Sequence, residues 1–431
     1  MPVPRLAAAA AAAATTLMLA PAALAAPGDL DASFGASGKL DFRFVSNETT
    51  WLTDVVAASD GSLVAVGTTV GTGSAPPALA LARFDDTGTR DTSYGDGGLT
   101  TLTESGYFLE PTTAARTSDG KLLVAGNRRN DDMSETGFFV ARFDTDGDLD
   151  TTFSDDGILI REVGTGEEES ITDLVIDGDG RLVIGAAVWG PSEMDGWFTV
   201  LRLLASGAPD TTFGTDGEAR MDAGTEDAPL ELAVEADDEI LAVAGGFDAN
   251  DRAQLQVVKL TEAGALDTTF GTDGLASTAF GTGVTVWPMS LALDANGKIV
   301  VSGQGSVENP TSTWTETGAF ARFTTSGALD TSFDTDGMAM AVPSATPLRV
   351  RVAPDGTIVF AGSAVIGSGR GFAVGRLLSG GALDTTFASD GMAVTSDSSA
   401  NAWVLEIADG HAVAAGTVSG EGRMYRYALT S

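Results

Sequence analysis

Seven aspartates in one repeated phrase are the first residues whose type and spacing suggest chemistry. The phrase reads Leu266-Asp-Thr-Thr-Phe-Gly271 in a full copy, and its aspartates are Asp31, Asp91, Asp150, Asp210, Asp267, Asp330 and Asp384. Seven basic residues recur at the ends of apolar segments: Arg83, Arg142, Arg202, Lys259, Arg322, Arg376 and Arg426. Aspartate accepts hydrogen bonds within tight turns and pairs with guanidinium groups. We therefore expect each aspartate to cap its own turn or to pair with an arginine.

Calcium binding is the alternative interpretation of these loops. Asp267 and Asp273 place two carboxylates on one short glycine-containing loop, and two further pairs repeat the spacing, Asp210 with Asp216 and Asp330 with Asp336. Calcium loops normally supply more oxygen ligands at closer spacing. We therefore expect no cofactor and no metal, and a loss of thermal stability on adding a chelator would support calcium.

Five of the six tryptophans, those in links between expected strands or at the entries to inner strands, are the second group with chemical potential. They are Trp51, Trp189, Trp197, Trp287 and Trp314, and carboxylates accompany them at Glu193, Asp195 and Glu316. Exposed tryptophan beside carboxylates can form a platform for sugar rings or another amphipathic ligand. The alternative is that these side chains only cover the ends of structural units. We predict a ligand-binding role for the eight residues.

Signals for catalysis are weak. The sequence contains no HExxH, nucleophile-elbow or Walker motif, and its single histidine, His411, follows a turn and is expected at the surface. Four acids, Asp54, Asp173, Glu231 and Glu406, fall on segments expected to line a central channel. Paired carboxylates can hydrolyse glycosides, but channel carboxylates more often hold water. We therefore assign no catalytic residue.

The elements that position these residues follow from a repeat of about 60 residues. The aromatic residue of the phrase recurs at Phe34, Tyr94, Phe153, Phe213, Phe270, Phe333 and Phe387, and a period of this length indicates a repeat architecture. Each unit contains an Asp-Gly or Asn-Gly pair between apolar segments, as at Asp119-Gly120. Such pairs favour two-residue hairpins in which both central residues take positive φ. The fourth unit reads Asp237-Asp238, and we expect another turn type there.

Four antiparallel strands per unit predict the blade of a β-propeller. The chain reaches its first phrase at residues 30–35 and a strand near Lys39–Phe44, yet ends without another phrase. We therefore predict an all-β, seven-bladed propeller whose N-terminal strand completes the last blade. The Asp-Gly turns and the aromatic phrases should share one side of the disc, the repeated face. The links between second and third strands, and those entering each unit, should form the irregular face.

These units resemble the delta-60 repeat of bacterial surface and secreted proteins. The resemblance rests on Lys121-Leu-Leu-Val-Ala-Gly126, Phe138-Phe-Val-Ala-Arg-Phe143 and Leu266-Asp-Thr-Thr-Phe-Gly271, and it extends over residues 28–431. It implies a β-propeller and no assigned activity.

Composition limits the partners and the compartment. The chain has 60 acidic and 24 basic residues, a net charge of −36, and no cysteine. This charge disfavours nucleic acid and anionic membranes, and disulfides and thiolate chemistry are excluded. A basic residue, an alanine-rich apolar run and Ala23-Leu24-Ala25 follow the order of a signal peptide. We predict a signal peptide at residues 1–25, a single propeller at 26–431, and no membrane insertion after cleavage.

A secreted or cell-envelope binding protein is the function that these patterns favour. The irregular face would engage an extracellular protein or glycan, and the protein would be a monomer without enzymatic activity. The alternative is a secreted polysaccharide hydrolase or lyase with acidic residues at the channel mouth. Tryptophans and carboxylates converging on one pocket would favour the enzyme.

Overall fold

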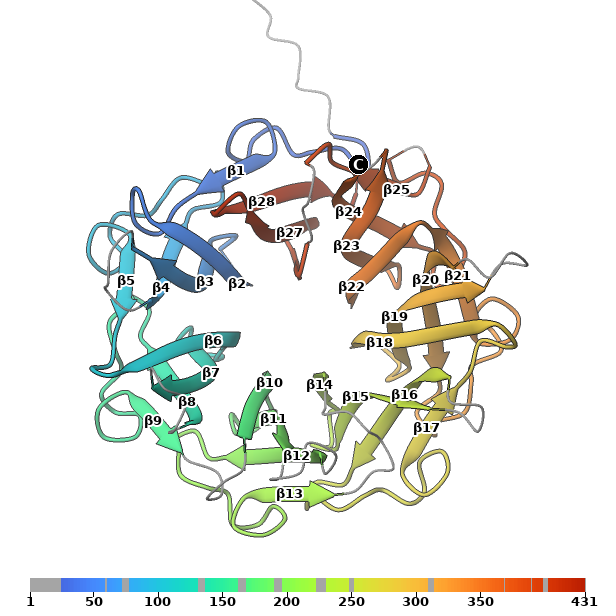
Figure 1. Cartoon of the computed structure of the whole chain (residues 1–431), viewed down its shortest axis with the longest axis horizontal. Coiled ribbons are helices and arrows are strands. Elements are labelled where there is room, and N and C mark those ends of the chain that lie inside the picture. The colour runs from blue at the N-terminus through green and yellow to red at the C-terminus, as the bar shows by residue number, and fades with distance from the viewer. Residues whose placement is uncertain are drawn as a thin grey trace, which may run out of the picture.

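Short turns join successive strands into seven four-stranded antiparallel sheets, arranged as blades around a central channel (Figure 1). The structure is a computed structural model that describes residues 25–58, 60–71, 77–130, 136–161, 168–189, 196–221, 230–247, 252–308, 314–367, 369–388, 390–397 and 402–430. The predicted seven-bladed propeller is confirmed. The predicted signal peptide lies outside the described residues, except for Ala25.

The blades follow one another along the chain, each beginning with its innermost strand. Blade 1 contains β2 (Thr49–Ala57), β3 (Leu63–Val70), β4 (Ala78–Phe84) and β5 (Leu99–Leu102). Blade 2 contains β6 (Tyr107–Arg116), β7 (Leu122–Asn130), β8 (Thr136–Phe143) and β9 (Ile158–Arg161). Blade 3 contains β10 (Glu168–Ile176), β11 (Leu182–Trp189), β12 (Gly196–Leu203) and β13 (Glu218–Met221). Blade 4 contains β14 (Glu231–Val234), β15 (Ile240–Phe247), β16 (Ala253–Leu260) and β17 (Leu275–Thr278). Blade 5 contains β18 (Val284–Leu293), β19 (Ile299–Glu308), β20 (Trp314–Phe323) and β21 (Met338–Pro343). Blade 6 contains β22 (Ala345–Val352), β23 (Ile358–Ile366), β24 (Gly369–Leu377) and β25 (Met392–Val394).

Blade 7 joins the two ends of the described chain. It contains β26 (Val404–Ala408), β27 (His411–Val418), β28 (Glu421–Ala428) and, as its outermost strand, β1 (Lys39–Phe42). Leu40 of β1 lies opposite Met424 of β28, and Figure 1 shows these two strands side by side. The prediction that the N-terminal strand completes the last blade is confirmed. Closure of this kind leaves no gap in the ring at which a sheet face would be exposed.

The hydrophobic core consists of seven layers, each between two neighbouring blades. In β8, Phe138 and Val140 pack toward blade 3, whereas Phe139 and Ala141 pack toward blade 1. Side chains alternate between the two sides of a strand, and here both sides are buried. This explains why the third strands read as continuous apolar runs.

The Asp-Gly turns differ in detail from the expected geometry. At Asp119-Gly120, Thr117 N donates to Lys121 O and Gly120 N to Thr117 O. This is a three-residue hairpin loop in which only the glycine has positive φ. Among the described Asp-Gly and Asn-Gly turns that join the first and second strands of a blade, both residues have positive φ only at Asp409-Gly410. The expectation of two-residue turns is therefore wrong for the other units, where a type I turn with a bulged glycine gives the strands a compatible twist.

The fourth unit was expected to have another turn type, and this is also wrong. Glu235 N donates to Glu239 O and Asp238 N to Glu235 O, the same pattern as in the other blades. Asp238 takes the glycine position with φ of 63°. Aspartate tolerates the left-handed region better than most residues, which explains why the turn survives the substitution.

The strand directions place the two kinds of loop as expected. Lys121, beside the first turn of blade 2, reaches Asp150 in the repeated phrase at 2.8 Å. The turns and the phrases therefore share the repeated face, and the links between second and third strands lie on the irregular face. No helix among the described residues is long and apolar enough to cross a membrane.

Candidate functional site

The repeated aspartates cap their own turns and pair with the arginines, as predicted. In blade 3, Asp210 Oδ1 accepts hydrogen bonds from the backbone N–H and the hydroxyl of Thr212, and Arg202 Nε donates to Asp210 Oδ2 at 2.8 Å. Five further pairs share this geometry: Arg83–Asp91, Arg142–Asp150, Arg322–Asp330, Arg376–Asp384 and Arg426–Asp31. The aspartates are therefore structural groups with their oxygens engaged.

Each of these arginines also holds the next blade. Arg202 Nη1 donates to Glu262 O of blade 4 at 2.7 Å, and its guanidinium lies 4.7 Å from the centre of the Phe213 ring. Gly264 of blade 4 covers the same ring, because a Cβ at that position would come within 2.9 Å of it. One cation thus joins a turn, a buried aromatic ring and the neighbouring blade.

Blade 4 departs from this pattern at Lys259. The ammonium lies 2.6 Å from both Glu235 Oε2 and Glu239 Oε2, and no bond from it to Asp267 is found among the described residues. Burial lowers the pKa of Lys259, but hydrogen bonds with the two glutamates outweigh it and the net shift is upward. A lysine has no fork with which to bond an aspartate and the next blade together.

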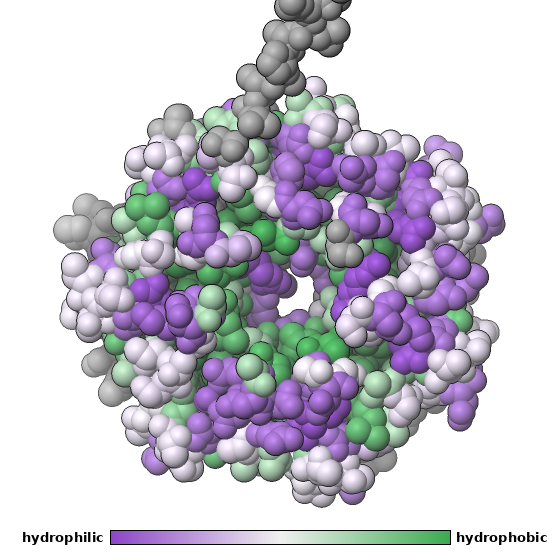
Figure 2. Space-filling model, turned by 180° about the vertical axis from the view of Figure 1, so that it is seen from behind, coloured by the Kyte–Doolittle hydropathy of each residue, from purple (hydrophilic) through white to green (hydrophobic). Residues whose placement is uncertain are grey.

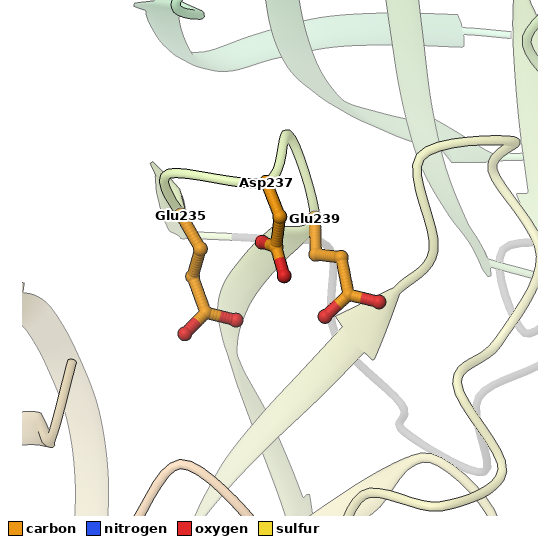
Figure 3. A group of neighbouring side chains, drawn as sticks. All are labelled: Glu235, Asp237 and Glu239. Atoms are coloured by element: carbon orange, nitrogen blue, oxygen red, sulfur yellow. The ribbon is translucent and has the colours of Figure 1, made fainter.

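Glu235, Asp237 and Glu239 form the group of acids among the described residues that is close enough to share a metal ion (Figure 3). Figure 3 shows the three carboxylates pointing to the same side of the turn. Lys259 already forms ion pairs with two of them, Glu235 and Glu239. In blade 4 this lysine therefore bonds the acids of the first turn, where the arginines of the other blades bond the repeated aspartate.

Four of the six aspartates considered for calcium have hydrogen-bond partners, Asp210, Asp267, Asp330 and Asp336. Asp267 Oδ1 accepts the backbone N–H and hydroxyl of Thr269, and Asp336 Oδ1 accepts Met338 N. Asp216 and Asp273 occupy left-handed backbone positions, with φ of 54° and 52°. These interactions explain the recurrence of the aspartates without a metal ion.

Three of the predicted tryptophans are exposed. Trp51, Trp287 and Trp314 expose 58%, 41% and 56% of their side chains. Trp51 and Trp287 occupy equivalent positions near the start of β2 and β18, at the irregular face, and these strands lie on opposite sides of the channel (Figure 1). Trp287 packs edge-on against Phe247 with ring centres 5.6 Å apart, and Trp314 begins β20.

The remaining predicted ligand residues are placed only in part. Trp189 ends β11 and Trp197 lies in β12 opposite Val188, whereas Glu193 and Asp195 lie outside the described residues. Glu316 pairs with Arg370 of blade 6 at 2.6 Å. The ligand-binding role of the eight residues stays a prediction, and Glu316 also links blades 5 and 6.

The central channel contains the four acids expected there. Asp54, Asp173, Glu231 and Glu406 line a cavity of about 370 Å³. Figure 2 shows the opening of the channel at the centre of the disc, bordered partly by hydrophilic and partly by hydrophobic residues.

Sequence reasoning missed three other lining residues, Arg349, Arg351 and Trp403. Aligning the units by their turns would have found them. Arg349 pairs with Ala361 as Asp54 pairs with Val66, so the two take the same position in their blades.

A belt of hydrogen bonds runs around this channel from blade 1 to blade 6. Innermost strands have one edge without a strand partner, and its backbone groups need other acceptors. Asp54 Oδ2 accepts Ala114 N, Asp173 Oδ2 accepts Leu232 N, and Glu231 Oε2 accepts Leu291 N. Thr113 donates to Asp173, and Ser290 accepts Val350 N. The three acids of the belt thereby have a structural role, because each accepts a backbone N–H of a neighbouring blade.

The belt stops at blades 6 and 7, where its positions hold Arg349 and Val404. Arg349 donates to Leu348 O and has no carboxylate within ion-pair distance among the described residues. Glu406 accepts no hydrogen bond from any described residue. Arg351, between them in sequence, crosses to Glu231 at 2.9 Å.

Burial shifts three acids of the channel toward their neutral forms. It raises the pKa of Asp54 and, together with the neighbouring Glu231 carboxylate, that of Asp173. Burial also raises the pKa of Glu406 to about 7, against an opposing effect of Arg351 and with a further rise from Asp54 and Glu231. Near neutral pH, Glu406 therefore exchanges its proton readily.

Four segments of the chain match the family described as "Domain of unknown function (DUF5122) beta-propeller": residues 58–94, 117–153, 295–333 and 353–387. Each segment runs from the first turn of a blade to its repeated aromatic residue, in blades 1, 2, 5 and 6. No curated protein matches the sequence.

Solved structures share the propeller architecture at low sequence identity. Polysaccharide lyase Uly1 is 11% identical over 88% of this chain and 90% of its own, with a TM-score of 0.50. An unknown function protein from Dyadobacter fermentans DSM 18053 is 12% identical over 91% of this chain and 98% of its own, with a TM-score of 0.45. The WD40 beta propeller domain of Doa1 is 11% identical over 90% and 97%, with a TM-score of 0.43. These likenesses concern the fold alone. The four matched segments and the closed ring identify the chain as a repeat-built β-propeller.

Proposed function

We propose that this chain is an exported, non-enzymatic binding protein whose irregular face engages an extracellular glycan. The observation that supports this is the exposure of Trp51, Trp287 and Trp314, 41% to 58%, at that face. On the repeated face, the aromatic residues of the phrase are 2% exposed or less, and each lies against an arginine or, in blade 4, against Lys259. Large exposed aromatic side chains on a rigid scaffold are typical of binding surfaces.

Export is part of this proposal. The resemblance of the units to the delta-60 repeat and the pattern of residues 1–25 support it. Cleavage after Ala25 would also leave the new α-ammonium at Ala26, whose nitrogen lies 3.0 Å from Asp29 Oδ2. The net charge of −36 favours an extracellular partner without anionic character, such as a neutral glycan.

A glycan array tests the proposal, with mature protein (residues 26–431) in calcium and in chelator. We expect selective binding that falls about tenfold or more in Trp314→Ala or Trp51→Ala. The matched control is Leu204→Ala, because Leu204 is 41% exposed and lies on the repeated face. Binding that survives both tryptophan variants, or no binding to any glycan, would leave a protein partner as the better account. Calcium dependence would restore a metal role for the aspartate loops.

A polysaccharide hydrolase or lyase is the second candidate. Glu406 favours it, because a carboxyl group with a pKa of about 7 and without a bonded partner can serve as a general acid or base. Against it, Asp54, Asp173 and Glu231 each accept a backbone N–H of the next blade. Release of reducing ends by the wild type, abolished in Glu406→Gln, would establish the enzyme.

A further inference from the structure

The central channel contains one cationic and one acidic side chain that form no ion pair at contact distance with any described residue, although opposite charges lie farther off in the same channel. Arg349 projects from β22 of blade 6 and Glu406 from β26 of blade 7, and both line the cavity of about 370 Å³. The other acids of this cavity accept main-chain hydrogen bonds, and Arg351 is paired with Glu231. The unpaired groups thus lie where the belt around the channel is interrupted.

From this arrangement we propose that the channel binds a small zwitterion, an α-amino acid with an apolar side chain. Its carboxylate would bind the Arg349 guanidinium, whose planar fork suits a carboxylate. Its ammonium would bind the Glu406 carboxylate. This site is independent of the glycan surface proposed above, and either can fail alone.

A zwitterion fits better than a singly charged ligand because both unpaired groups would be desolvated on binding. A simple anion would satisfy Arg349 and leave Glu406 facing it, and a simple cation would do the reverse. An unpaired Arg349 guanidinium, which stays charged, would cost several kcal/mol in a desolvated site, whereas Glu406 would have to take up a proton. The four acids also repel an anion that carries no compensating positive charge.

The rest of the lining supplies surfaces for the remainder of the ligand. Trp403 and Leu230, 41% and 36% exposed, provide apolar surface at the cavity. A cavity of this volume is within the range of small-molecule sites.

Isothermal titration of the purified protein with L-phenylalanine and L-leucine tests the proposal. The matched controls are 3-phenylpropionate, which lacks the ammonium group, and 2-phenylethylamine, which lacks the carboxylate. We expect one site for L-phenylalanine or L-leucine, and L-phenylalanine binding at least about tenfold tighter than either control, equivalent to about 1.4 kcal/mol. Tryptophan fluorescence should change on binding in the wild type and not in Trp403→Leu.

Variants separate the two charges. Arg349→Gln and Glu406→Gln should each weaken L-phenylalanine binding about tenfold or more, while Glu308→Gln, an exposed glutamate at the end of β19, should leave it unchanged. Circular dichroism and the melting temperature confirm that each variant is folded. Affinity should fall below neutral pH as Glu406 is protonated, within a site where Arg351, Asp54 and Glu231 also face it. Equal binding of either control compound, retention of affinity in either charge variant, or no binding of both amino acids would overturn the proposal.

Discussion

The repeated face and the central channel both concentrate charged residues, but they use them differently. On the repeated face, Arg202 has an aspartate, a hydroxyl, a ring and a carbonyl of the next blade as partners. In the channel, Arg349 has one carbonyl of its own strand and Glu406 has no bonded partner among the described residues. One region satisfies its charges within the fold, and the other keeps two of them available.

This difference separates the positions that repeat in every blade from the channel positions that vary between blades. A group that appears in every blade is selected by the need to join blades, so its hydrogen bonds are internal. The channel positions vary from blade to blade, from Asp54 through Ser290 to Arg349, because they only have to satisfy one strand edge. Channel side chains that do not bond a strand edge, such as Arg349, are available for a ligand.

Removing the arginine of a repeated pair should have the largest effect. Arg202→Met should destabilise the protein by about 3–5 kcal/mol, because Arg202 is 1% exposed and its loss leaves Asp210, 4% exposed, without its counter-charge. Urea unfolding measures this change. The control Arg129→Met breaks an ion pair with Glu110 whose side chains are 38% and 39% exposed, and it should cost about 1 kcal/mol or less. Equal effects of the two variants would show that the repeated pairs are no more important than surface ion pairs.

The loop after the repeated aromatic residue provides a second, smaller test within the repeated face. Gly214→Ala should destabilise by about 2 kcal/mol, because φ is 53° there and a Cβ would lie 2.0 Å from Glu218 O. In blade 6 the same position holds Ala388 with φ of 50°. Ala388→Gly should change stability by about 1 kcal/mol or less. Thermal unfolding of both variants compares them, and a tolerated alanine at residue 214 would contradict the steric argument.

These two loops also show what the sequence can and cannot predict. The phrase predicted a turn capped by aspartate in every blade, and this is confirmed. The loop nevertheless takes two forms. Where glycine follows the aromatic residue, the third residue after the aromatic has a positive φ, as at Asp216. Where another residue follows it, the second residue after the aromatic has a positive φ, as at Asp155. Glycine permits the first form because it has no Cβ to clash with a carbonyl of the fourth strand, as at Gly214 against Glu218 O. The phrase shows the glycine, but it does not show this contact.

The channel was predictable in part for a similar reason. The strand pattern placed Asp54, Asp173, Glu231 and Glu406 at the inner edge, and their side chains line the cavity. It did not indicate which acids accept backbone N–H groups of the next blade, because that depends on register between blades 60 residues apart. Arg349 was missed because its charge alone does not indicate that it faces the channel. Its position in the blade follows from its pairing with Ala361 of the second strand.

The acid of the channel that the fold leaves unpaired should be the one whose neutralisation stabilises the protein. Burial raises the pKa of Glu406 from 4.5 to about 7, so between these values the folded chain holds a proton that the unfolded chain has lost. Wild-type stability therefore falls as pH rises from about 4.5 to about 7, whereas a glutamine at this position does not titrate. Glu406→Gln should gain about 3 kcal/mol relative to wild type between pH 4.5 and pH 8, as measured by urea unfolding at both values. Glu308→Gln should show no such gain, because Glu308 is exposed.

A Glu406→Gln variant that is equally stable relative to wild type at both pH values would mean that the channel solvates Glu406 as well as water does. The contrast with the repeated face would then rest on Arg349 alone. A gain in stability together with weaker amino-acid binding would instead identify Glu406 as a residue retained for its ligand.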